Sequence, residues 1–131
     1  MSNKNWLEIL HWNEEHIEDL KYTGYSYIRQ GKYEIALAFF EALMILEPQE
    51  TYNIQTIGAI YLQQNEPAKA LEYFQKALKL TGNHGPTLIN LAKAFFMLNN
   101  KEEGLRIAHV LKTDNDATIS NMAKALIMAY S

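Results

Sequence analysis

The stretch TYNIQTIGAIYLQQNEPAKALEYFQKALKLTG, residues 51–82, decides the fold of this chain. Its apolar residues recur at spacings of three and four on both sides of Asn65-Glu66-Pro67, which is the pattern of two amphipathic helices joined by a tight turn. Pro67 suits the first position of a helix, where a missing N–H costs nothing. Gly82 is placed to end the second helix. We therefore predict a helix–turn–helix unit.

The same residue types return when the chain is shifted by 34 residues in either direction. Small side chains let two helix backbones approach closely. A glycine inside a helix costs about 1 kcal/mol relative to alanine, so a glycine kept in register indicates that the space is needed. We expect the aromatic residues of the first helices to fill the space one turn along. The aligned sets are Gly24, Gly58 and Ala92; Tyr27, Tyr61 and Phe95; Ala36, Ala70 and Gly104; and Phe40, Phe74 and Ala108.

A helix–turn–helix unit with this period and these small and aromatic positions resembles the tetratricopeptide repeat (TPR). The resemblance covers about residues 17–118, in repeats at about 17–50, 51–84 and 85–118. The sequence departs from the family pattern at Leu20, Ile54 and Leu88, which stand where the repeat often has tryptophan. The predicted fold is all-α, a TPR-type α-solenoid of three repeats within one domain, residues 1–131.

Turn residues delimit the helices of the outer repeats. Gly31 separates helices near 15–30 and 33–47, and Asn99-Asn100 separates helices near 86–98 and 101–113. Asp116 is a candidate N-cap for a capping helix at about 117–130. In that helix Met122, Ala125, Leu126 and Ala129 follow the spacing of one apolar face. We expect this face to cover the open end of the stack.

The amino-terminal segment is predicted to form a short helix near residues 4–13. It carries a heavy apolar load that includes Trp6, Leu10 and Trp12. One interpretation is a cap folded over the first repeat. The other is a contact with a second copy or a small co-chaperone, because a short helix that is apolar on several sides cannot bury all of them against one neighbour.

The amino-acid composition excludes several classes of protein. The 131 residues are 48% hydrophobic, include no cysteine and carry a formal charge of −3, so disulfides and thiol catalysis are excluded and nucleic acid is not indicated as a partner. No apolar run is long enough to span a membrane. The amino terminus lacks the features of a signal peptide, so we expect a cytoplasmic protein.

The sequence offers no set of residues for catalysis. Its histidines do not stand at metal-ligand spacing, apart from the single pair of His11 and Glu15, and no phosphate-binding loop or nucleophile motif occurs. The methionines lie at helical spacing among apolar residues, where filling the core is their usual role. We predict no enzyme activity, no metal and no cofactor.

The TPR resemblance implies a binding groove lined by the first helix of each repeat. The positions that face this groove in the family are Tyr25, Ile28, Tyr52, Ala59, Leu62, Ile89, Phe96 and Met97. Such an apolar and aromatic groove suits an extended or helical protein segment. In the alternative interpretation, the amino-terminal or final helix folds into the groove and covers these residues.

Some TPR domains clamp the terminal carboxylate of heat-shock proteins with Lys, Asn and Arg side chains. Lys21 matches one member of that set, but Tyr25 and Thr56 replace the expected asparagines. The clamp is therefore not predicted.

The run GKYEIALAFFEALMILEP, residues 31–48, is similar to the first repeat of the small TPR chaperones of bacterial type III secretion. Such chaperones hold translocator or needle subunits, or a small export component, in the cytoplasm before export. The resemblance implies a non-catalytic chaperone that binds a secreted client. A generic TPR adaptor or scaffold is the alternative.

Overall fold

The computed structural model describes residues 6–131. Throughout these residues the regular structure is α-helical, which confirms the predicted all-α fold. Residues 4 and 5 of the predicted amino-terminal helix lie outside the described residues. The helices are α1 (Trp6–Leu10), α2 (Glu14–Arg29), α3 (Tyr33–Leu46), α4 (Thr51–Gln63), α5 (Pro67–Leu80), α6 (Gly85–Met97), α7 (Lys101–Leu111) and α8 (Ala117–Tyr130).

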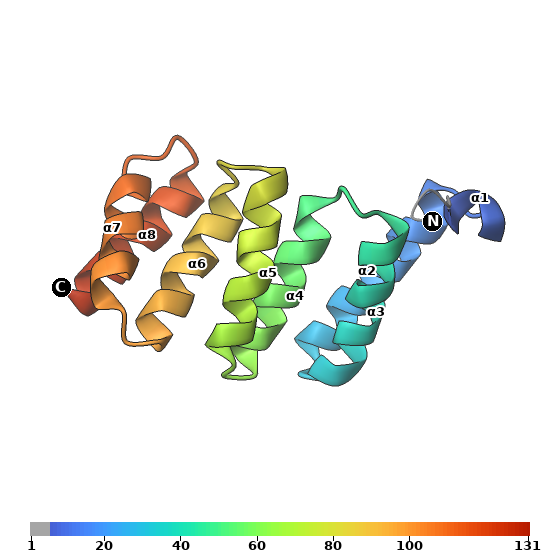
Figure 1. Ribbon diagram of the computed structural model, residues 1–131, viewed down its shortest axis with the longest axis horizontal. Helices are drawn as coiled ribbons and strands as arrows, with labels where there is room; N and C mark the ends of the chain where they lie inside the picture. The colour runs from blue at the N-terminus through green and yellow to red at the C-terminus, as the bar shows by residue number, and fades with distance from the viewer. Residues whose placement is uncertain (1–5) are drawn as a thin grey trace.

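Three helix pairs, α2–α3, α4–α5 and α6–α7, lie side by side along the long axis of the molecule (Figure 1). Each pair packs against the next, through α3 with α4 and through α5 with α6. The final helix α8 packs on α7 and α6, and α1 lies at the opposite end of the array. Contacts mainly between neighbouring units are typical of an α-solenoid.

The turn inside each repeat has the same backbone structure. Gly31, Asn65 and Asn99 have left-handed φ angles of 75°, 60° and 62°. In each turn the following residue donates its N–H to the carbonyl five residues back, as Lys32 does to Tyr27 at 2.9 Å. This is the Schellman arrangement, which glycine and asparagine favour at the left-handed position. The predicted breaks within the repeats are confirmed.

Two of the predicted helix starts are also confirmed. Pro67 is the first residue of α5. Asp116 caps α8, because its carboxylate oxygen Oδ1 accepts hydrogen bonds from the backbone N–H groups of Thr118 at 2.8 Å and Ile119 at 3.3 Å. The loop before α8 therefore satisfies two amide groups that the helix itself leaves without partners.

The end of α5 differs from the prediction for Gly82. The helix ends at Leu80, and Thr81 follows in an extended conformation with φ −139° and ψ 97°. The Thr81 hydroxyl lies 2.7 Å from the hydroxyl of Thr51 at the start of α4. The change of direction therefore occurs at Thr81, with Gly82 in the loop that follows.

In the first two repeats a phenylalanine ring fills the space above a glycine. A Cβ added to Gly24 would lie 2.7 Å from the Phe40 ring, and one added to Gly58 would lie 2.5 Å from the Phe74 ring. Both phenylalanines come from the second helix of the repeat and are fully buried. The predicted tyrosines lie one turn along, where Tyr27 lies beside Phe39 and Tyr61 beside Tyr73, with ring centroids 5.6 and 5.7 Å apart.

In the third repeat the glycine of this contact stands on the second helix and the phenylalanine on the first. Ala92 and Ala108 replace the glycine and the phenylalanine, while Phe96 on the first helix lies over Gly104 on the second. A Cβ added to Gly104 would lie 2.7 Å from the Phe96 ring. A large side chain from one helix therefore still meets a glycine on the other, and the smaller residues at Gly104 and Ala108 are compensated by Phe96.

The prediction of which apolar face attaches α8 to the stack was partly wrong. Ala125 and Ala129 are exposed, and the buried residues of α8 are Ile119, Ser120 and Ala123. Met122 and Leu126 of the predicted face are half-buried and pack against the core cluster that also contains residues of α6 and α7.

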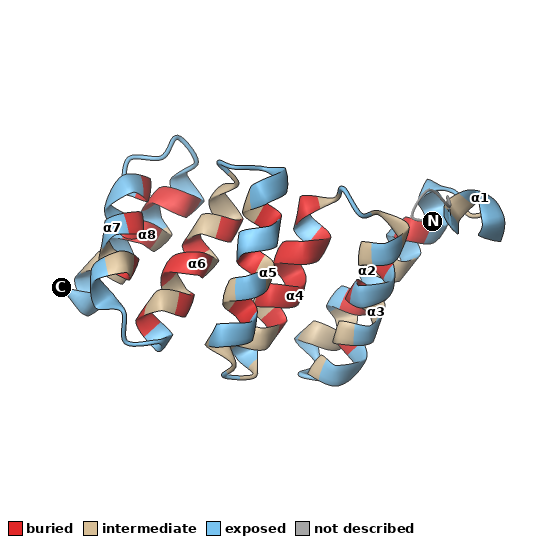
Figure 2. Ribbon diagram, viewed as in Figure 1, coloured by how far each residue is buried: buried red, intermediate tan, exposed pale blue. Residues whose placement is uncertain are grey.

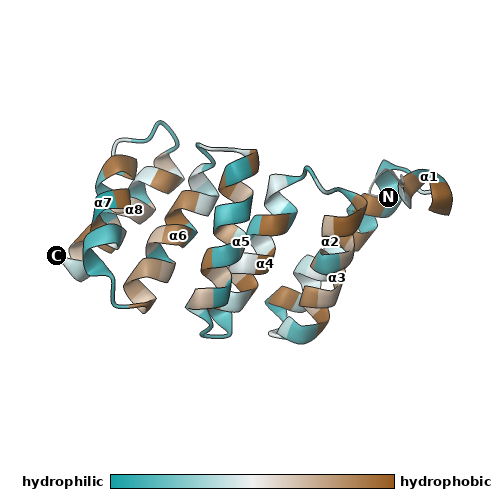
Figure 3. Cartoon of the chain, viewed as in Figure 1, coloured by the Kyte–Doolittle hydropathy of each residue, from teal (hydrophilic) through white to brown (hydrophobic). Residues whose placement is uncertain are grey.

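The core consists of two clusters of buried side chains, one in each half of the array, and Tyr61 packs against both. Buried residues are concentrated on α4 and α6 (Figure 2). Along α5, hydrophobic and hydrophilic residues alternate (Figure 3). The first helices of the second and third repeats are therefore enclosed by neighbours, and α5 keeps one solvated side.

Candidate functional site

The first helices α2, α4 and α6 form a surface that we call the first-helix face. In stacked helical repeats this is the concave side of the solenoid. Side-chain hydrogen bonds connect its helices: the hydroxyls of Tyr25 on α2 and Thr56 on α4 lie 3.3 Å apart. Further along, the Asn90 amide on α6 donates to the side-chain oxygen of Gln55 on α4. These polar groups are thus satisfied within the protein.

Lys21 on this face is paired as well. The Lys21 ammonium lies 3.3 Å from a carboxylate oxygen of Glu47, at the end of α3. The same oxygen accepts a hydrogen bond from the Asn53 amide at 3.2 Å. Both charges of the pair are partly shielded from solvent, so Glu47 offsets the positive charge that a carboxylate ligand would need.

The predicted groove residues divide into an open group and a buried group. Tyr25, Tyr52 and Met97 are exposed, and Ile28, Ala59 and Leu62 are half-buried. Ile89 and Phe96 are only 1% and 6% exposed, so the prediction that they line an open groove is wrong. The structure thus leaves an open apolar and aromatic surface mainly on α2 and α4.

Phe96 is buried because α8 covers it. The rings of Phe96 and Tyr130 are stacked, with centroids 4.0 Å apart and planes within 5° of parallel. Gly104 lies against the Phe96 ring as well. The alternative in which the final helix covers part of the groove therefore holds for this one position, while Leu62, one repeat earlier, keeps part of its surface.

The amino-terminal residues divide between core and surface. Leu7 and Trp12 pack against the core cluster of the first repeat, and Trp12 also stacks on His16 with ring centroids 5.6 Å apart. Trp6 and Leu10 are 41% and 43% exposed. The segment thus attaches to the first repeat and still presents large apolar side chains to solvent, a combination that fits both of the interpretations made from the sequence.

His84 is a site that the sequence analysis did not single out. It is the N-cap residue of α6; its Nδ1 lies 2.7 Å from the Thr87 hydroxyl, and its ring meets Tyr52 edge-on with centroids 4.4 Å apart. Its Nε2 is buried, with no hydrogen-bond partner among the described residues. Burial lowers the pKa of His84 below the usual 6.5, partly offset by the carboxylate of Glu50.

We expect the free energy of unfolding to decrease when the pH is lowered through the pKa of His84. In the unfolded chain His84 binds a proton near pH 6.5, more readily than in the fold, so the unfolded state gains protons first. Above about pH 6.5 His84 makes its full contribution to the free energy of unfolding. This contribution is lost as the pH falls through the lowered pKa of the folded state. His84→Gln should flatten urea-unfolding midpoints plotted against pH, whereas His109→Gln, at an exposed position, should not.

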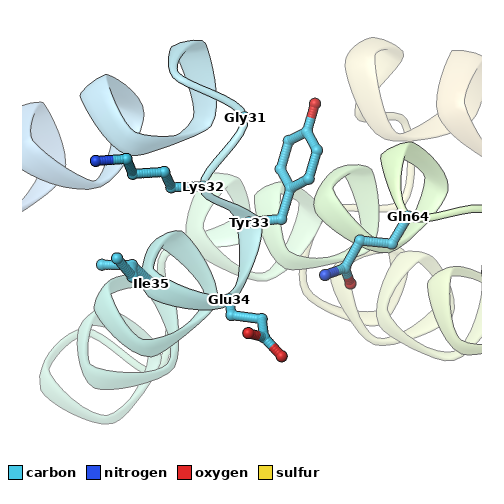
Figure 4. Close-up of a pocket in the computed structure, with 6 residues that line it drawn as sticks. All are labelled: Gly31, Lys32, Tyr33, Glu34, Ile35 and Gln64. Atoms are coloured by element: carbon cyan, nitrogen blue, oxygen red, sulfur yellow. The ribbon is translucent and has the colours of Figure 1, made fainter.

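Two of the hollows formed by the described residues lie outside the first-helix face. One, of about 460 Å³, lies between the start of α3 and the end of α4, with Tyr33, Glu34 and Gln64 in its lining (Figure 4). The other, of about 360 Å³, has a mainly apolar lining between α5, α6 and α7. Neither gathers the acidic and imidazole side chains of a reaction centre.

The described residues give no indication of a metal centre or a membrane segment. Among residues 6–131, no three His, Asp or Glu side chains are grouped so that they could hold a metal ion. Within the same residues, none of the helices combines the length and apolar character that crossing a bilayer requires.

Comparison with known proteins agrees with this repeat architecture. The family model described as anaphase-promoting complex, cyclosome, subunit 3, matches residues 29–111, more than half of the chain. No curated protein matches the chain in sequence.

Solved structures of similar fold come from two groups of TPR proteins. The type III secretion translocator chaperone SycD of Yersinia enterocolitica is 17% identical, with a TM-score of 0.84 over 97% of this chain and 98% of its own. PcrH in complex with the chaperone binding region of PopD is 20% identical, with a TM-score of 0.78 over 90% and 92% of the two chains.

The second group is represented by the first TPR of Spaghetti (RPAP3) bound to the HSP90 peptide SRMEEVD. It is 22% identical, with a TM-score of 0.74 over 89% of this chain and 94% of its own. At these identities the likeness is one of fold. With its 34-residue period, its recurring Schellman turns and the match to the family model, the chain is a tetratricopeptide-repeat protein and belongs to the family described as anaphase-promoting complex, cyclosome, subunit 3.

Proposed function

We propose that this protein is a non-catalytic chaperone that holds a type III secretion client in the cytoplasm before export. The client is a needle subunit, a translocator or a small export component, bound through one segment on the first-helix face. The observation that carries the proposal is the open aromatic and apolar surface of that face on α2 and α4, where Lys21, Gln55 and Thr56 are paired inside the protein. Soluble monomers rarely keep such a surface without a use.

The neighbouring structures support this class of function. SycD is described as a translocator chaperone, and PcrH is seen with the chaperone binding region of PopD. The structural alignment with this chain extends over almost the full length of both proteins. A small stack of repeats that binds one segment of a larger protein is therefore a fitting model for this chain.

The structure of the first-helix face favours an internal client segment over a chain terminus. The RPAP3 domain is seen with an HSP90 peptide, but Lys21 of this chain is paired with Glu47. Tyr25 and Thr56, which replace the asparagines of a carboxylate clamp, are bonded to each other. A terminal carboxylate would have to break these pairs, whereas an uncharged apolar segment would not.

We expect Leu62→Glu to abolish client binding and to leave the protein folded. Leu62 is half-buried on the open part of the face, and an unpaired carboxylate there would be desolvated by a bound segment. The measurement is co-expression with the needle, translocator and export proteins of the same organism, followed by calorimetric titration of whichever client becomes soluble.

Leu80→Glu is the matched control, because Leu80 is exposed at the end of α5, in the layer of second helices. The rescue of an aggregation-prone client separates the chaperone from the alternative, a generic TPR adaptor, which would bind partners without keeping them soluble. Unchanged affinity in folded Leu62→Glu would remove the first-helix face from the mechanism.

We further propose that the amino-terminal segment contacts a second copy or a small co-chaperone. Trp6 and Leu10 present apolar surface there. Deleting residues 1–13 should change the mass measured by light scattering or abolish co-chaperone binding. It should also lower the melting temperature, because Leu7 and Trp12 pack against the core. The same monomer mass before and after deletion, with no partner lost, would make the segment a cap only.

A further inference from the structure

The helix α8 occupies the place of a fourth first helix. It contacts α6, as α6 contacts α4. When the three helices are aligned on their first residues, Thr51, Gly85 and Ala117, their third residues are all buried, and so are their seventh residues. The third residues are Asn53, Thr87 and Ile119, and the seventh are Ile57, Leu91 and Ala123.

The same alignment places apolar residues of α8 on the first-helix face. The ninth residues are Ala59 and Lys93, both half-buried, and Ala125, which is exposed. The thirteenth residues include Met97 and Ala129, which are both exposed. The stacked rings of Phe96 and Tyr130 hold α8 against α6. The apolar surface of the face therefore continues from Met97 on α6 to Ala125 and Ala129 on α8.

The helices that form the face differ in their charged residues. α2 carries four acidic and two basic residues, and α4 carries no charged residue. α6 and α8 contain no acidic residue and one lysine each, Lys93 and Lys124. Lys93 stands in the groove-facing ninth position, and within the described residues it forms no ion pair. A segment that fits the α6–α8 end should therefore carry a negative charge.

We propose that the binding groove extends onto α8, and that its α6–α8 end takes an apolar stretch of the client with one acidic residue whose carboxylate meets Lys93. The inference rests on the proposed function, because it concerns the client segment of the same face. Met97, Ala125 and Ala129 supply the apolar contact, and methionine adapts readily to different side chains.

A random 12-residue peptide display library, selected on the full chain, provides the probe. The selected peptides should combine aliphatic residues with an Asp or Glu, and calorimetry should give about tenfold or greater loss of affinity in Ala125→Glu. Gln75→Glu is the matched control, because it makes the same charge change at an exposed position of α5. Melting temperatures show whether each variant is folded, and Ala129→Glu replaces Ala125→Glu if that variant does not fold.

Charge reversal tests the role of Lys93 directly. Lys93→Glu should weaken the selected acidic peptides, and it should bind their Glu→Lys or Asp→Lys versions more tightly than the wild-type protein does. The inference would be overturned if the selected peptides contained no acidic residue. It would also be overturned if Ala125→Glu, Ala129→Glu and Lys93→Glu all bound the peptides with the affinity of the wild type.

The same titrations separate this inference from the proposed function. If Leu62→Glu abolishes binding while the α8 variants do not affect it, the groove stands and its extension onto α8 fails. If Leu62→Glu also has no effect, or if no peptide is selected, the proposed function itself fails.

Discussion

Gly58→Leu should lose much of its folding stability, because the added side chain has no room. A Cβ at this position would lie 2.5 Å from one carbon of the Phe74 ring and 2.7 Å from the next. Phe74 is fully buried, so its ring cannot move into solvent. Overpacking of this kind costs about 1–3 kcal/mol and sometimes more. Urea unfolding followed by circular dichroism measures the loss.

Gly82→Ala is the matched control, since a Cβ there meets nothing within 4 Å. A double variant that adds Phe74→Leu to Gly58→Ala should recover part of the stability lost in Gly58→Ala alone, because the smaller side chain frees space above residue 58. If Gly58→Leu had the melting temperature of the wild type, the contact between α4 and α5 at residue 58 would not be close-packed.

Phe96→Glu should unfold the third repeat. Phe96 is 6% exposed, stacks on Tyr130 and lies over Gly104. Removing a buried phenylalanine ring costs about 3–5 kcal/mol, and a carboxylate in the same place adds the cost of burying a charge. Far-ultraviolet circular dichroism should show a large loss of helix, whereas Leu62→Glu, at the corresponding position of the second repeat, should keep its helix content.

Phe96→Leu is the control for volume, because it keeps an apolar side chain over Gly104 and gives up the ring stacking. It should remain folded, with a lower melting temperature. A folded Phe96→Glu with the melting temperature of the wild type would mean that α8 does not hold this ring in solution.

The helix pairs and their turns could be predicted from the sequence, because both depend on local chemistry. The period of 34 residues fixes where the helices recur, and Asn65-Glu66-Pro67 contains a residue that tolerates left-handed backbone next to one that can start a helix. These signals lie within a few residues of the structures they determine. The family's groove positions also located the open surface at Tyr25, Tyr52 and Leu62.

The burial of individual groove residues could not be predicted, because it depends on a neighbour distant in the chain. Phe96 stands where Ile28 and Leu62 stand in their repeats, and its burial follows from the stacked ring of Tyr130. The start of α8 at Ala117 was predicted from its N-cap Asp116. Which side of α8 packs is decided by α6 and α7, which come from other parts of the chain.

The exchange of glycine and phenylalanine in the third repeat bears on how such repeats are recognised. Gly24 and Gly58 lie under rings from the second helix, whereas Gly104 on the second helix lies under Phe96 from the first. All three units thus keep a contact between a glycine of one helix and a phenylalanine ring of the other, although the third forms it at different aligned positions. A search that scores each column independently will undervalue a degenerate unit of this kind, whereas one that scores paired columns for complementary size should detect it.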